Sequence, residues 1–209
     1  MMRTRREMLT LTGAGLMLPL APVAPRATEK PEPPRNDDGL HTQPWFHESF
    51  LDLKEDLTEA EKAGKSLAVM FEQRGCPYCK EMHVTNLSDP EIASYIQKHF
   101  LVVQLNLYGA RTVTDFDGKE LEERALARRW GVNFTPTIYY FVPPAAALAG
   151  KDGGSAAAWK LIGYWKPFHF HQTFAYVHER AYAAPGGFQK WLGERAEKLR
   201  AEGKDVRLW

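Results

Sequence analysis

The sequence predicts an α/β protein with a central mixed β-sheet, helices on both faces of the sheet, and an extra helix at the C-terminal end. Three observations predict this fold. Strand-length apolar runs alternate with helix-like segments in the order β-α-β-α-β-β-α, which is typical of a sheet covered by helices on two sides. The strand-like runs are too apolar for exposed edges, so their faces are expected to be buried. Several helix-like segments open with recognisable start signals.

Three helices and two strands are expected before residue 110. The first helix ends at Gly64, and apolar residues recur in it at helical spacing; these are Phe50, Leu53, Leu57 and Ala60. The two strands are apolar runs at 66–72 and 100–107. Between the strands, one helix continues to about residue 86, and the run at 88–91 (SDPE) starts another with a cap, a proline in its first turn and an early carboxylate.

The second half supplies the rest of the sheet and the closing helices. The segment 109–118 is polar and rich in turn residues, and a helix over 121–130 ends at Gly131. A β-branched and aromatic strand follows at 137–142. An Ala- and Gly-rich loop over 143–158 leads to a strand at 159–163, and helices over 168–182 and 188–199 complete the chain.

The two cysteines of the chain, Cys76 and Cys79, stand in a Cys-Pro-Tyr-Cys run where a strand gives way to a helix. A thiol in the first turn of a helix lies near unpaired N–H groups and the positive end of the helix dipole, which favour the thiolate. Pro77 suits the first helical position, which needs no N–H. Because Cys79 is one turn further on, its sulfur can close a disulfide or resolve a mixed one. The pattern predicts redox chemistry with Cys76 as the nucleophile.

A metal site is the alternative interpretation of the same cysteines. His83 completes a Cys-x-x-Cys-x-x-x-His run on one helix face, so a copper or zinc site would need one or two distant ligands. A structural zinc site usually has four protein ligands, and there is no second cysteine pair. We therefore expect His83 to be solvated or to pack. His169, His171 and His178 are expected to face solvent, with the last two on one side of their helix.

The N-terminal segment indicates export. Arg3, Arg5 and Arg6 precede an uncharged apolar stretch from residue 8 to residue 20, which is too short to span a bilayer and is typical of a signal peptide. The run at 4–9 (TRREML) is similar to a twin-arginine signal, and an ordinary secretory signal is the alternative. Either route leads to the periplasm. We place the signal peptide at 1–27, followed by a proline-rich linker or arm at 28–45.

Composition limits the remaining possibilities. Residues 1–27 carry four Arg and one Glu, which leaves a net charge of −2 on the rest of a chain whose total is +1. Nothing in the exported part is basic enough to indicate nucleic-acid binding. With both cysteines in one motif, no other disulfide can form, so stability must come from a hydrophobic core. The 44% hydrophobic content is consistent with one such domain.

The cysteine motif and a second motif, at 130–137 (WGVNFTPT), together resemble the thioredoxin superfamily. In that family, a proline that follows a cis peptide bond faces the cysteine pair, and Thr135-Pro136 matches it. The resemblance covers residues 46–184 and leaves 185–209 as a C-terminal helical extension. It implies a thioredoxin fold and substrate binding by Pro77, Tyr78, Thr135 and Pro136. A cis proline lacks an N–H and leaves the backbone before it free to pair with a substrate strand.

A narrower resemblance is to the periplasmic SoxW-type thioredoxins of bacterial sulfur-oxidation clusters. It rests on the runs 70–73 (MFEQ), 80–83 (KEMH), 104–107 (QLNL) and 163–168 (GYWKPF). Thioredoxins ordinarily have Trp before the first cysteine and a buried Asp six residues before it, whereas this chain has Gly75 and Met70. Glu72 leaves the strand on the same face as Met70, so we expect it to replace the usual base; a surface glutamate is the alternative.

These features predict a periplasmic thiol–disulfide oxidoreductase. The redox-active disulfide itself carries the electrons, so no flavin, nicotinamide or metal is needed. The resemblance implies that the partners are protein thiols and disulfides, including sulfur-oxidation carrier proteins, and that a membrane thiol-electron transporter recharges the protein. Stable membrane insertion after cleavage is not expected. The sequence leaves the direction open, because similar pairs in thioredoxin and DsbA differ by about 150 mV.

Overall fold

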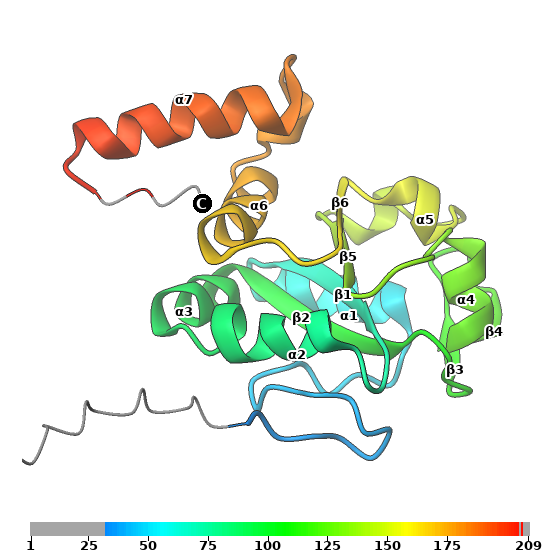
Figure 1. Cartoon of the computed structure of the whole chain (residues 1–209). Coiled ribbons are helices and arrows are strands. Elements are labelled where there is room, and N and C mark those ends of the chain that lie inside the picture. Colours follow the sequence, from blue (N-terminus) through cyan, green and yellow to red (C-terminus); the bar gives the residue numbers. More distant parts are fainter. Residues whose placement is uncertain (1–31, 205, 207–209) are drawn as a thin grey trace, which may run out of the picture. The chain divides into compact units, whose positions relative to one another are not determined.

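The computed structural model describes residues 32–204 and residue 206. The predicted signal peptide at 1–27 and the first residues of the predicted arm lie outside this range. Within it, a four-stranded sheet forms the centre of the fold (Figure 1). Its strands are β1 (Ser66–Glu72), β2 (Phe100–Asn106), β5 (Thr137–Phe141) and β6 (Trp159–Ile162).

The sheet has the order β2-β1-β5-β6. β1 and β2 are parallel, whereas β5 runs antiparallel to both β1 and β6. All seven residues of β1 and all five of β5 are buried, as expected for strands covered on both faces. The sheet is therefore mixed, and with a helical layer on each side it confirms the predicted thioredoxin fold.

Helices cover both faces of the sheet (Figure 1). One face is packed by α1 (Leu53–Lys62) and α4 (Glu123–Arg129). The other is packed by the π-helical segment η1 (Met82–Leu87), α3 (Pro90–His99) and α6 (Pro167–His178). Side chains alternate between faces along a strand. Ala68 and Met70 of β1 belong to the second core, and Glu72 has the same parity.

The predicted start signal of α3 is confirmed, because Asp89 caps this helix and Pro90 occupies its first turn. Asp52 caps α1 by accepting the N–H groups of residues 54 and 55. The remaining elements are α2 (Pro77–Glu81), β3 (Thr112–Thr114), β4 (Glu120–Glu122), η2 (Ala145–Ala147), α5 (Gly153–Ala156), η3 (Ala181–Ala183) and α7 (Gly187–Ala201).

Three local expectations are wrong. Phe50 is fully exposed, because Asp52 caps the helix and leaves Phe50 outside it. The turn-rich segment 109–118 contains β3, which pairs with β4 in a separate two-stranded sheet, so the following helix begins at Glu123 and not at residue 121. The Ala- and Gly-rich loop over 143–158 contains a 3₁₀ turn and the short helix α5, which Asp152 caps.

Residues 32–47 form a segment that we call the N-terminal arm. Its backbone folds back on itself, with a bridge between Arg35 and His41, and Leu40 is only 1% exposed. At its end, the His47 N–H donates to the carbonyl of Val102 in β2 over 2.9 Å. The arm therefore lies along the edge strand of the sheet, which limits pairing of that edge with other chains.

α7 follows α6 at the C-terminal end, and its Phe188 and Leu192 pack against Tyr176 of α6. In the part of the chain that the structure covers, no helix combines the length and apolarity needed to cross a membrane.

Candidate active site

The cysteine pair lies where β1 leads into α2. Cys76 is the N-cap of α2 and Pro77 occupies its first turn. The Cys76 sulfur accepts the backbone N–H of Cys79 over 3.0 Å, and the two residues form a disulfide with their Cα atoms 5.2 Å apart. Backbone N–H groups at the start of a helix favour a thiolate there, so this position suits Cys76 as the nucleophile. Cys76 is 6% exposed and Cys79 only 2%, so Cys76 is the more accessible sulfur.

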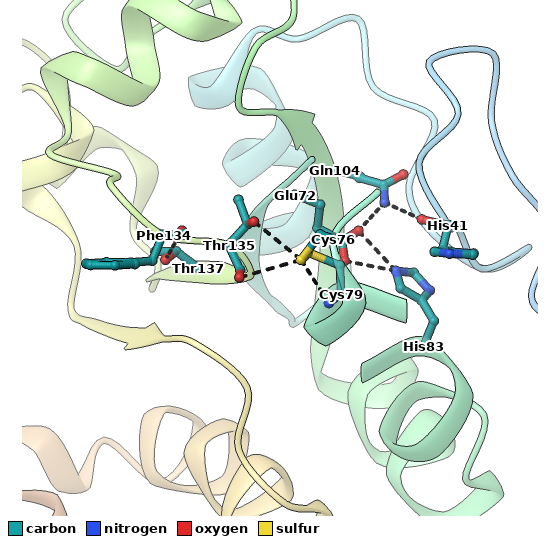
Figure 2. The surroundings of a disulfide bond; sticks show 9 residues. All are labelled: His41, Glu72, Cys76, Cys79, His83, Gln104, Phe134, Thr135 and Thr137. Atoms are coloured by element: carbon teal, nitrogen blue, oxygen red, sulfur yellow. Dashed lines mark hydrogen bonds and ion pairs between the residues drawn. A yellow bond between two sulfur atoms is a disulfide. The ribbon is translucent and has the colours of Figure 1, made fainter. Parts of the chain in front are cut away.

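The second motif lies directly across from the pair (Figure 2). The Thr135–Pro136 peptide bond is cis. The Thr135 hydroxyl donates toward the Cys76 sulfur over 3.4 Å, and the sulfur lies 3.6 Å from the Thr135 carbonyl oxygen. The hydroxyl adds a second donor to the one supplied by Cys79. The structure therefore brings together Cys76, Cys79 and the Thr135-Pro136 segment.

Exposed aromatic side chains lie on the segments next to the disulfide. Tyr78, inside the cysteine motif, is 63% exposed and stacks on Tyr164 with ring centroids 6.3 Å apart. Phe134, which precedes Thr135, is 68% exposed. Large exposed apolar groups near a reactive centre are typical of a surface that contacts another protein.

Glu72 is not a surface residue, because it is only 1% exposed at the end of β1. Its two carboxylate oxygens lie 3.0 and 3.2 Å from Nε2 of His83, which is completely buried on η1. Gln104 of β2 donates a further hydrogen bond to the same carboxylate. His83 is therefore packed and not solvated, so the expectation of a solvated His83 is wrong. Its ring binds the Glu72 carboxylate inside the protein.

The N-terminal arm completes this buried network. Gln43 Nε2 lies 3.2 Å from His83 Nδ1 and donates to the His83 carbonyl oxygen over 3.4 Å. Gln104 Nε2 also donates to the carbonyl of His41 over 2.6 Å. Burial, assisted by the positive charge of Arg35, lowers the pKa of His41 below its ordinary value. His41 therefore stays uncharged beside the network near neutral pH.

The expectation that His169, His171 and His178 face solvent is correct only for His178. His178 is exposed, but His169 and His171 are half-buried, and burial lowers the pKa of both. His171 and His178 do share a side of α6, since both rings contact Tyr95 of α3. Within residues 32–204, no group of three metal-ligating side chains is assembled. His83 in particular has both ring nitrogens engaged in hydrogen bonds.

Sequence reasoning missed two members of the site, Gln43 and Gln104. Both contact the buried pair through tertiary structure, so spacing along the chain carries no signal for Gln43. A signal does exist for Gln104, because it is a polar residue within the apolar strand β2. It is paired in the parallel β1–β2 ladder with Met70, which lies two residues before Glu72. A polar residue in the middle of an apolar strand usually has a buried hydrogen-bonding partner.

A mixed sheet flanked by helices, with a disulfide at a helix start and a cis proline opposite, defines a thioredoxin-type domain and supports the class of thiol–disulfide oxidoreductases. The family of thioredoxin-like domains matches residues 53–178. The chain belongs to this family. A comparison with curated protein sequences finds no match.

Several solved structures are similar to the chain. A thioredoxin-fold protein from Helicobacter pylori is 23% identical, over 71% of this chain and 90% of that one, with a TM-score of 0.46. A thioredoxin from Thermus thermophilus is 27% identical, over 60% of this chain and 83% of that one, also with a TM-score of 0.46. The oxidised C-terminal domain of DsbD from Neisseria meningitidis is 20% identical, over 59% and 90%, with a TM-score of 0.40.

Proposed function

We propose that the protein is a periplasmic thiol–disulfide oxidoreductase that reduces disulfides of partner proteins, and that its partners belong to a sulfur-oxidation system. The observation that carries the chemical part is the Cys76–Cys79 disulfide at the start of α2, facing the Thr135–Pro136 segment. The SoxW-like runs of the sequence support the choice of partners, and the signal-like segment at 1–27 supports the compartment.

The first step begins with the reduced protein. The Cys76 thiolate attacks one sulfur of a partner disulfide, so a Cys76–partner bond forms and the partner S–S bond breaks. The released partner thiolate takes a proton from water. The N–H of Cys79 and the hydroxyl of Thr135 point at the Cys76 sulfur and hold its charge before the attack. Tyr78 and Phe134 are placed to contact the partner beside the reacting sulfurs.

The second step releases the partner. Cys79 gives up its thiol proton and attacks the Cys76 sulfur, which forms the internal disulfide and breaks the mixed one. The second partner thiolate leaves and is protonated. Two electrons have then passed from the cysteine pair to the partner, whose two thiolates take their protons from water. An external dithiol, such as a membrane thiol-electron transporter, must return the electrons. Glu72 is our candidate acceptor for the Cys79 proton, because it is a buried carboxylate on the sheet face that η1 and α3 cover.

Insulin reduction with dithiothreitol as electron source tests the activity. We expect Cys76→Ser to abolish catalysed turnover, since the attacking sulfur is gone. Cys79→Ser is the matched control: it keeps the nucleophile but cannot resolve, so it should accumulate a mixed disulfide that mass spectrometry detects. Turnover in Cys76→Ser equal to that of the unaltered protein would contradict the proposal.

The direction is tested by the equilibrium potential of the pair against glutathione or dithiothreitol. Thioredoxin lies near about −270 mV and DsbA near about −120 mV, a difference of roughly 7 kcal/mol for two electrons. A value close to that of thioredoxin supports a reductant, whereas a value close to that of DsbA would make the protein an oxidant.

Export and partners need separate tests. Changing Arg5 and Arg6 together to lysine should retain the protein in the cytoplasm if the twin-arginine route carries it, and a secretory signal would tolerate the change. Cys79→Ser expressed in a sulfur-oxidising bacterium should capture carrier proteins through disulfides that thiol reductants release. Capture of unrelated proteins alone would contradict the sulfur-oxidation role.

A further inference from the structure

We propose that His83, oriented by Gln43 of the N-terminal arm, positions the Glu72 carboxylate to accept the proton of Cys79, so that the arm is a working part of the redox site. The inference rests on the proposed function and deepens it. His83 and Gln43 are positioning residues in this scheme, because they act on Cys79 only through Glu72.

The positions of the three groups follow from their elements. Cys79 and His83 are four residues apart, so they lie one turn apart on the same helix face, and both are buried against the sheet. Glu72 leaves β1 on the sheet face that carries η1 and α3. Figure 2 shows the dashed hydrogen bonds that join the Glu72 carboxylate to the His83 ring. The carboxylate therefore lies beside His83, one helical turn from Cys79.

Gln43 determines which nitrogen of His83 carries the proton. Its amide nitrogen faces the His83 carbonyl oxygen, which can only accept, so the amide nitrogen is the donor there. The same nitrogen faces Nδ1 at 3.2 Å, which makes Nδ1 an acceptor. The ring proton is then on Nε2 and points at Glu72. Without Gln43, the ring could carry its proton on Nδ1 and turn a lone pair toward the carboxylate.

The hydrogen bonds also leave one carboxylate oxygen with spare accepting capacity. Oε2 accepts from both His83 and Gln104, whereas Oε1 shares only the His83 proton among the hydrogen bonds of the described residues. A carboxylate offers about four acceptor positions. Oε1 is therefore the atom that can take a further proton, and the partners on Oε2 keep it in place.

The proton balance is simple. During resolution the Cys79 S–H bond breaks, its proton passes to Glu72, and the sulfur keeps the electron pair with which it attacks Cys76. When an external dithiol later reopens the disulfide, the same proton returns to the Cys79 thiolate. No group other than the external dithiol of the proposed function is consumed.

Other charged groups near the pair are few. The arm contributes His41, whose ring centroid is 6.1 Å from that of His83, and α2 contributes Cys79 itself. β2 contributes Gln104, which is neutral. Burial and the positive charge of Arg35 lower the pKa of His41, so its ring adds no positive charge to the network at alkaline pH.

The test separates the two chemical steps by single-turnover reaction of the reduced, full-length protein with dithiobis(nitrobenzoate). The first thionitrobenzoate released reports attack by Cys76, and the second reports resolution by Cys79. We expect Glu72→Gln to slow the second release by about 100-fold near neutral pH, the usual contribution of a general base. The first release should change by less than about threefold.

His83→Leu should slow the second release by about tenfold, which is what a hydrogen bond to a charged group is worth. His83→Gln keeps an N–H donor and should stay within about threefold of the unaltered protein. Gln43→Leu should slow the second release selectively, and Gln97→Leu, the same change at an exposed site on α3, should not. Should His83→Leu fail to fold, the two glutamine variants still decide the question.

The pH profile distinguishes proton transfer from a structural effect. Resolution in Glu72→Gln should approach the unaltered rate at alkaline pH, where a thiol ionises in water without a base. An unchanged second release in Glu72→Gln near neutral pH would overturn the proposal, and so would equal losses in His83→Leu and His83→Gln. Either result leaves insulin turnover by the Cys76–Cys79 pair intact, so the proposed function fails only through its own test.

Discussion

Replacing Leu40 by alanine should make the N-terminal arm open more often without unfolding the protein. Leu40 is 1% exposed, and the change removes about three methyl or methylene groups from a buried position. At about 0.8 kcal/mol for each group, docking is weakened by about 2.4 kcal/mol. Because about 1.4 kcal/mol corresponds to a factor of ten, the arm should open about 50-fold more often. The arm is a segment at the periphery, so local opening absorbs the loss.

Hydrogen exchange measures this opening residue by residue. The N–H of His47 donates to the carbonyl of Val102 in β2, so this amide exchanges when the arm leaves the sheet. We expect it to exchange about 50-fold faster in Leu40→Ala, with no change in the amides of β1. Phe50→Ala is the control, because it removes a larger side chain that is fully exposed. An equal rise in β1, or a rise below about fivefold in the arm, would refute the reasoning.

Three further predictions concern stability and substrate binding. Asp115→Asn should cost about 1.5–3 kcal/mol in urea unfolding, because it removes a fully buried charged acceptor that Arg129 contacts at 2.8 Å, although Asp117 still pairs with Arg129. Burial lowers the pKa of His171 below 6.5, so the unfolded chain binds a proton more readily and the free energy of unfolding falls as the pH drops through and below that value. His171→Phe should therefore lose less stability than the unaltered protein between about pH 7.5 and about pH 5.5, and an equal loss would exclude this residue as a cause. Tyr78→Ala should raise KM for insulin several-fold and leave the rate with dithiobis(nitrobenzoate) unchanged, because its exposed ring contacts protein substrates only; a fall in both rates would show that the ring supports the cysteines instead.

Most of the fold could be predicted because its signals are local. The central strands are continuous apolar runs, since both faces of the sheet are covered, and Asp89 with Pro90 marks the start of α3 in the sequence itself. β3 and β4 were missed because strands of three residues are too short to show periodicity. Phe50 was misplaced because helical spacing continues across Asp52, although the helix begins only after this N-cap residue.

The candidate site was predictable only in part. The chemistry of Cys76 and Cys79 follows from two sulfurs one helical turn apart, and the spacing of the two residues in the sequence shows this directly. Glu72 and His83 could also have been paired, because each shares a face with a buried neighbour, Met70 in one case and Cys79 in the other. The contribution of Gln43 could not, since it depends on the path of a proline-rich segment that has no periodic pattern of its own.

The position of Glu72 explains why the arm is needed at all. A carboxylate at the last residue of β1 lies at the end of the sheet, where water would ordinarily solvate it and weaken its influence on a nearby thiol. The arm supplies part of the cover over this end of the sheet. Residues 41–43 of the arm contact both partners of Glu72, His83 through Gln43 and Gln104 through the carbonyl of His41. Opening of the arm would therefore bring water to the carboxylate and to both of its donors at once. Leu40→Ala and Gln43→Leu are consequently expected to slow the same step, resolution by Cys79. Leu40→Ala acts through more frequent opening of the whole arm, and Gln43→Leu acts through the loss of a single hydrogen bond.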